Sequence, residues 1–165
     1  PISSRKSAEA VASEIRRALG SFPAIPPNAE VAPRSILTGW IAGEPMPDGL
    51  TLGEECELKD AMDGGAVVKA QHQELLSDEI AKHLEAGKQV TKLALNLDDH
   101  LSFVLGEDLV VRKLKFLEGA VDQLESTERD DLRAELDARF ALLAGEARRL
   151  FLVLESALKL SKAEA

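Results

Sequence analysis

Apolar and polar residues alternate along much of the segment 88–117, a pattern typical of strands in a half-buried antiparallel sheet. Leucine and phenylalanine take the inward positions, and the polar runs DDH and GED separate the strands as turns. A further run, GGAVVKAQHQ, predicts a strand after a glycine pair. The four predicted strands span residues 65–72, 88–97, 100–105 and 109–117.

Other stretches repeat their apolar residues every three or four positions, as helices do. Ser7 is expected to cap a first helix, 7–20, which Gly20 ends. A second, short helix at 34–45 is anchored by Trp40, and a third runs from Ser77 to Gly87. From residue 118 onward the spacing predicts a long C-terminal helix, with Gly145 as a candidate break.

Two segments carry no such period. Four prolines within 21–33 predict an extended connector that crosses the surface. Residues 46–60 mix turn signals with short alternating runs, and Glu57 and Lys59 are expected to be exposed strand residues.

These elements predict an α+β fold, with a mostly antiparallel sheet, helices packed on one face of it and a long C-terminal helix. The leucine stripe of that helix favours packing on the sheet, and self-association through it is the alternative. The whole chain, 1–165, is expected to form a single unit. Its parts are a helical and proline-rich entry (1–45), the sheet with one inserted helix (46–117) and a helical region (118–165).

Composition narrows the class of protein. Of 165 residues, 45% are apolar and 30% charged, which is enough apolar surface for a folded core. Cys56 is the only cysteine, so no internal disulfide can form, and a reducing cytoplasm is expected. No run approaches the roughly 20 apolar residues of a membrane span. We therefore expect a cytoplasmic protein without a membrane partner.

The charge distribution is uneven. The net charge of −9 disfavours indiscriminate binding to polyanions, yet the four predicted strands carry six basic residues and no acid. Pleating is expected to place at least Lys88, Lys92, Lys113 and Lys115 opposite the leucines, forming an acid-free basic surface suited to phosphates. Lysines on a solvated strand face are the alternative interpretation. The six residues are Lys69, Lys88, Lys92, Arg112, Lys113 and Lys115.

Catalytic chemistry is weakly signalled. Asp48, Glu57 and Lys59 match the PD…ExK spacing of metal-dependent nucleases, but a turn and two exposed strand residues explain them more simply. Asp98 and Asp99 are expected to serve a turn rather than acid–base chemistry. Three histidines, His72, His83 and His100, fall on different elements without the spacing of a zinc site. We predict no catalytic residue, metal site, cofactor or small-molecule substrate.

Several longer stretches resemble the recombination-associated protein RdgC family. The run from GGAVVKAQHQ through KQVTKLALNLDDHLSFVLGEDLVVRKLKF carries most of the likeness. Supporting stretches occur in the family's order: RRALGSFPAIP, LTGWIAGE, ECELKD and DARFALLAGEARRLFLVLESAL. The resemblance covers nearly the whole chain and corresponds to the C-terminal portion of the family's longer proteins, so a truncated piece or an abbreviated relative is expected.

The resemblance implies a non-enzymatic protein that binds double- and single-stranded DNA with little sequence preference. It also implies a ring-like homodimer, association with the nucleoid, and restraint of the RecA recombinase by competition for DNA. The six basic residues are the implied DNA contacts, although Gln71 and His72 are neutral where the family tends to be more basic. The alternative is a self-association domain whose DNA-binding surface lies elsewhere.

Overall fold

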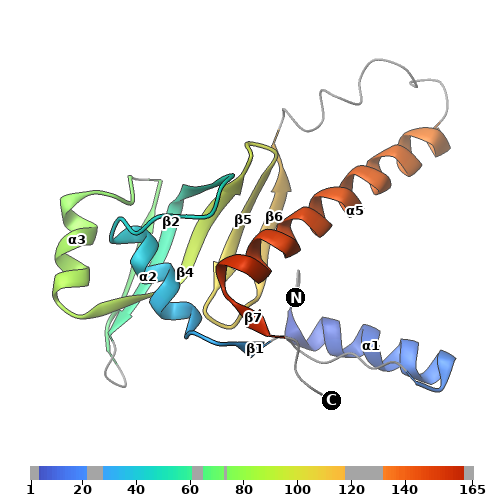
Figure 1. The fold of residues 1–165 in the computed structure, drawn as a ribbon, viewed down its shortest axis with the longest axis horizontal. Helices are drawn as coiled ribbons and strands as arrows, with labels where there is room; N and C mark the ends of the chain where they lie inside the picture. Colours follow the sequence, from blue (N-terminus) through green and yellow to red (C-terminus); the bar gives the residue numbers. More distant parts are fainter. Residues whose placement is uncertain (1–3, 22–27, 61–64, 73, 118–131, 162–165) are drawn as a thin grey trace.

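The computed structural model describes residues 4–21, 28–60, 65–72, 74–117 and 132–161 (Figure 1). Its helices are α1 (Arg5–Leu19), α2 (Pro33–Ile41), α3 (Asp78–Glu85) and α5 (Leu132–Ala157). Its strands are β1 (Asn28–Ala29), β2 (Leu50–Asp60), β3 (Val67–Gln71), β4 (Lys88–Leu97), β5 (Leu101–Gly106), β6 (Val111–Phe116) and β7 (Leu160–Ser161).

Five of the strands form a curled antiparallel sheet in the order β3-β2-β4-β5-β6, and β1 pairs with β7 in a separate two-stranded ribbon. The predicted α+β class and the antiparallel sheet are therefore confirmed. β4 has the bounds that alternation predicted. Asp98 and Asp99, with φ of 46° and 56°, take the left-handed conformation in the three-residue connection between Leu97 and Leu101, where the His100 N–H donates to the Leu97 carbonyl at 2.9 Å.

The helices depart from the prediction at their ends. α1 begins two residues early, because the hydroxyl of Ser4, and not Ser7, caps it by accepting the backbone N–H of Ser7 at 3.1 Å. Gly20 ends it in the left-handed conformation, as predicted. α5 runs unbroken through Gly145, so the candidate break there was wrong. The predicted start of this helix, at 118–131, lies outside the described residues.

β2 is the main element that the pattern missed. Leu50–Asp60 is one strand at the centre of the sheet, paired with β3 on one side and β4 on the other. Its inward residues fall at even numbers, but Glu54 interrupts them where the pairing with β4 shifts register. The sequence of β2 therefore does alternate, and Glu54 is the one polar residue at a position where the pattern expects an apolar one.

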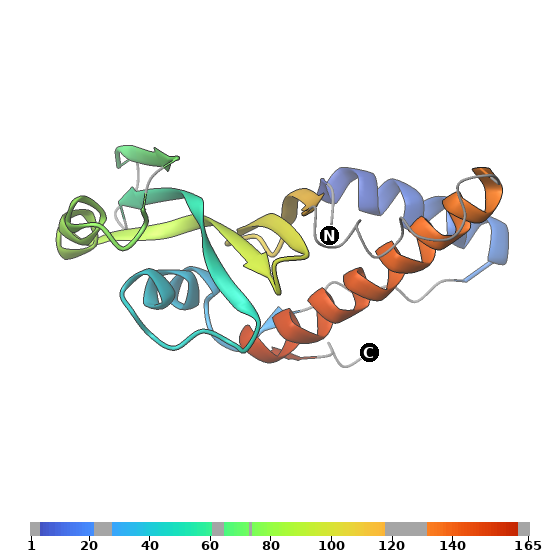
Figure 2. The same cartoon turned by 90° about the horizontal axis from the view of Figure 1, so that it is seen from above.

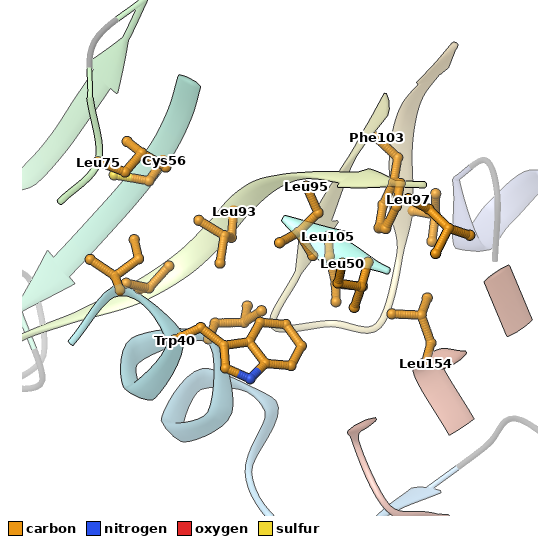
Figure 3. Close-up of a cluster of buried hydrophobic side chains, with 14 of the residues drawn as sticks. Trp40, Leu50, Cys56, Leu75, Leu93, Leu95, Leu97, Phe103, Leu105 and Leu154 are labelled. Carbon is orange, nitrogen blue, oxygen red and sulfur yellow. The ribbon is translucent and has the colours of Figure 1, made fainter. Parts of the chain in front are cut away.

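The core lies on the leucine face of the sheet, where α2 and the C-terminal turns of α5 cover it (Figures 1 and 3). Trp40 of α2 is 5% exposed and packs among strand residues such as Leu95 and Leu105 (Figure 3). Leu150 and Leu154 of α5, with Leu158 directly after the helix, belong to the same cluster. Core packing of the C-terminal helix is thus confirmed at this end.

The far half of α5 extends away from the sheet, and so does α1 beyond its first turn, where Arg5 shares a hollow with Arg112 and Lys113 of β6 (Figure 2). α1 has no buried residue, and Phe140 of α5 is 72% exposed. No described helix packs across the opposite face of the sheet, and this uncovered face holds most of the predicted basic residues.

Candidate nucleic-acid interface

The uncovered face of the sheet is hollowed into a groove of about 500 Å³. Its lining includes Gly53, Ala94 and Ser102 beside the buried Phe103 and Val104, and Lys113 and Lys115 of β6 lie along it. The walls come from β2 and β6, which two other strands separate in the sheet order. Curling of the sheet therefore makes this face concave.

Five of the six predicted residues share this face. Lys69 and Lys92 flank Glu57 as its registered partners on the two neighbouring strands. On β6, the pairing with β5 shifts register between Arg112 and Lys115, and Lys113 takes a φ of 52°. A bulge of this kind lets residues of both parities point to one side, which is how β6 presents its three cations to the uncovered face.

Lys88 is the exception. Glu57 pairs with Lys92 and Leu58 with Val90, so Thr91 is an extra residue that reverses the alternation of β4. Lys88 lies two residues before Val90, which is fully buried in the core. It therefore falls on the leucine side at the end of the sheet, and the expectation that it faces the same way as Lys92 was wrong.

The expectation of an acid-free surface was also wrong, because β2 brings carboxylates into its middle. Glu57 is only 8% exposed, and its carboxylate accepts hydrogen bonds from Lys92 Nζ at 3.0 Å and Thr91 Oγ1 at 3.2 Å. Lys69 Nζ lies 3.8 Å away. Burial raises the pKa of Glu57, but the Lys92 ammonium and the Thr91 hydroxyl outweigh it and hold the pKa below its usual value.

Glu55 forms the second ion pair. Both of its carboxylate oxygens accept from Lys113 Nζ at 2.7 Å, and Gln71 Nε2 lies 3.4 Å from one of them. The Lys113 ammonium holds the pKa of Glu55 below its usual value. Gln71, predicted as a neutral gap in the basic pattern, is therefore a hydrogen-bond partner of a groove carboxylate.

Arg112 is bound by Asp108, four residues earlier in the turn before β6, which also accepts the backbone N–H of Val110. The Arg112 guanidinium lowers the pKa of Asp108. Lys115, which lines the groove, has no ion pair with any described residue. Four of the five predicted cations on this face therefore pair with three carboxylates, and Glu54 adds a fourth carboxylate to the groove.

The residues that resembled a nuclease motif or a metal site do not form such a site in the structure. Asp48 precedes β2 and Glu57 lies near its end, so an extended strand of roughly 3.3 Å per residue keeps them too far apart for one metal ion. Glu57 was expected to be exposed, and that was wrong. His100 lies 3.6 Å from Glu146 of α5. Among the described residues, no group of three His, Cys, Asp or Glu side chains could hold a metal.

None of the described helices is both long enough and apolar enough to cross a membrane.

A family model described as "Putative exonuclease, RdgC" matches residues 2–161. The recombination-associated protein RdgC of Xanthomonas campestris pv. campestris (strain B100) is 78% identical over 163 residues, covering 99% of this chain and 54% of the relative.

Further relatives carry the same name. The protein of Xanthomonas axonopodis pv. citri (strain 306) is 78% identical over 162 residues, and that of Stenotrophomonas maltophilia (strain R551-3) is 72% identical over 162 residues. Each alignment covers 98% of this chain and 54% of the relative. The chain thus spans about half the length of these curated relatives.

Proposed function

Because this chain belongs to the RdgC family, we propose that it acts in DNA recombination by binding DNA, double- or single-stranded, without sequence preference. Family membership itself supports a role in recombination. The finer proposal is that the chain contributes to a ring-like homodimer at the nucleoid, and that it restrains RecA by competing for DNA.

One observation carries the proposal: five basic side chains lie on the one sheet face that no described helix covers. Contacts from lysine and arginine to phosphates release counterions and need no base recognition. The outward residues at the groove floor, such as Ala94, Asn96 and Ser102, are not aromatic and offer no platform for stacking bases. Backbone contact is therefore the mode that this surface supports.

Charge reversal tests the proposal directly. Lys92, Lys113 and Lys115 are changed together to Glu, and affinity for a labelled duplex and a matching single strand is measured by anisotropy at several salt concentrations. We expect much weaker binding, with the salt slope reduced by about 0.9 for each duplex phosphate that the variant no longer neutralises.

A matched control reverses three exposed cations on helices, Arg17, Lys82 and Arg148, for the same change in net charge. This variant should lose far less affinity, because its charges lie away from the groove. Equal losses in the two variants would overturn the assignment to the sheet face.

Competition with RecA follows from the same surface. Adding the chain to a RecA strand-exchange reaction should inhibit it in proportion to DNA occupancy, and the sheet-face variant should not inhibit. Inhibition that survives the loss of DNA binding would refute competition for DNA as the mechanism.

A self-association domain is the second candidate, favoured by large apolar side chains exposed on α1 and α5. Leu19 and Phe140 are 71% and 72% exposed, and Val11 and Phe151 are also more than half exposed. Sedimentation over a range of concentrations measures association. A dimer whose DNA affinity is unchanged by the sheet-face reversal would favour this candidate.

The description of the matching family model also calls for a nuclease test. Linear duplex DNA is incubated with the chain and Mg²⁺, beside a Glu57→Ala variant. Our proposal expects intact DNA in both reactions, and degradation by the parent chain alone would replace it with a catalytic role.

A further inference from the structure

The ion pair between Lys113 and Glu55 joins strands that are not neighbours. β4 and β5 lie between β2 and β6 in the sheet, yet Lys113 Nζ is 2.7 Å from both carboxylate oxygens of Glu55. Both residues line the groove. The pair therefore spans the hollow from one wall to the other.

Glu55 is placed to exchange its partner, whereas Glu57 is not. The side chain of Glu55 is 33% exposed and that of Lys113 is 56% exposed, so water and ions reach both groups. Glu55 also lies within the register shift of β2 between Leu52 and Cys56, where pairing with β4 is interrupted. Glu57, by contrast, is 11% exposed at its side chain and held by Thr91 as well as Lys92.

We propose that the Glu55 carboxylate is an internal competitor for the DNA phosphate at Lys113, and that it sets the affinity of the groove. In the free protein, the two carboxylate oxygens occupy the position on the ammonium that two phosphate oxygens would take. Binding of a backbone phosphate replaces Glu55, which turns to solvent. This inference rests on the proposed function, since it names the residue that limits the same surface.

The strength of the pair decides whether exchange is feasible. Ion pairs with this exposure contribute little, typically under about 1 kcal/mol, because water and salt screen them. A phosphate can therefore displace Glu55 at a cost of roughly two- to five-fold in affinity. Such a cost is large enough to measure and too small to prevent binding.

The experiment compares Glu55→Gln with Glu54→Gln in the 165-residue chain. Both variants remove one negative charge at the groove, but no ion pair with a described lysine involves Glu54. We expect Glu55→Gln to bind labelled duplex about two- to five-fold more tightly, with the salt slope steeper by up to about 0.9, and Glu54→Gln to change affinity less.

A double-mutant cycle isolates the pair. In a Lys113→Gln background, Glu55→Gln should have no larger effect than Glu54→Gln, because the cation that Glu55 competes for is gone. Equal effects of the two single variants, or a Glu55→Gln gain that persists without Lys113, would overturn the proposal in favour of long-range charge.

The failure of this inference is distinct from failure of the proposed function. If the sheet-face charge reversal weakens DNA binding but Glu55→Gln leaves affinity unchanged, internal competition is refuted. The proposal that the sheet face binds DNA is then still supported. If the parent chain does not bind DNA at all, both are refuted.

Discussion

Replacing Lys92 by Met should expose the electrostatic dependence of Glu57 on its partner. Glu57 is 8% exposed, and Lys92 supplies its shortest charged contact, at 3.0 Å. Met keeps the length and apolar stem of the lysine and removes only its ammonium. The variant therefore leaves a mostly buried carboxylate with the weaker contacts from Thr91 and from Lys69 at 3.8 Å.

The expected loss follows from burial and from what remains. Breaking a fully buried ion pair costs about 3–5 kcal/mol. Lys92 is 41% exposed at its side chain and two contacts to Glu57 persist, so we expect a loss of about 1–2 kcal/mol at neutral pH.

The pH dependence of stability separates a charge effect at Glu57 from a loss of packing. In the parent chain, the folded pKa of Glu57 is below its usual value, so its contribution to stability is present at neutral pH and lost as pH falls through the folded pKa. Without Lys92, burial dominates and should raise the pKa of Glu57 above the unfolded value. The loss of unfolding free energy caused by Lys92→Met should then shrink as the pH is lowered towards about 4, because the Glu57 carboxyl takes up a proton in the folded and in the unfolded variant.

Urea unfolding followed by circular dichroism, at about pH 7.5 and about pH 4.5, measures the difference in unfolding free energy between parent and variant. Adding Glu57→Gln to Lys92→Met should recover most of the loss at the higher pH, because the uncompensated charge is removed. A penalty that is equal at both pH values, or that the second substitution does not reduce, would refute a charge-based account.

Three other expectations concern the scaffold. Leu154→Ala, at a side chain 7% exposed, should reduce the unfolding free energy by about 2–4 kcal/mol in urea titration, whereas Phe151→Ala, 54% exposed on the preceding turn of the helix, should stay within about 0.5 kcal/mol. Gly145→Ala should stabilise the chain by about 0.5–1 kcal/mol, because no atom lies within 4 Å of the added Cβ. Gly49→Ala should destabilise it by about 1–3 kcal/mol, because φ is +84° and the added Cβ would meet a carboxylate oxygen of Asp98 at 2.5 Å. The opposite order of melting temperatures would contradict both expectations. Burial raises the pKa of Cys56 to about 11, so its thiol should resist Ellman's reagent near pH 8 in the folded chain and react in urea; fast reaction without denaturant would show that the core opens there.

Local periodicity predicted the elements whose alternation is regular. The bounds of β4 and the turn at Asp98 and Asp99 were recoverable because leucines recur at every second position and two aspartates tolerate left-handed backbone. Trp40 and the last leucines of the predicted stripe, Leu150, Leu154 and Leu158, were likewise recognisable as core by their spacing, but Phe140 and Leu143 of the same stripe are exposed.

Irregularities of pairing were not recoverable from the same pattern. The extra residue at Thr91 moves Lys88 to the leucine side, and nothing in a single strand shows that its partner lacks a matching residue. The bulge at Lys113, by contrast, lets Arg112, Lys113 and Lys115 of β6 point to the same face of the sheet.

The order of strands was the larger gap. Counting charges over four predicted strands left out β2, which lies between β3 and β4 and carries Glu55 and Glu57. Which strands become neighbours is decided by packing of the whole sheet rather than by any local run. The acid-free surface failed for that reason.

The ribbon of β1 and β7 has a consequence for how the chain is made. Asn28 pairs with Ser161, and the intervening chain contains the entire five-stranded sheet. During translation, that sheet can assemble with α2 while Leu150 and Leu154 of α5 are still inside the ribosome, leaving the part of the leucine surface that α5 covers exposed. We expect ribosome-bound chains halted before residue 150 to recruit chaperones, and full release to end that dependence.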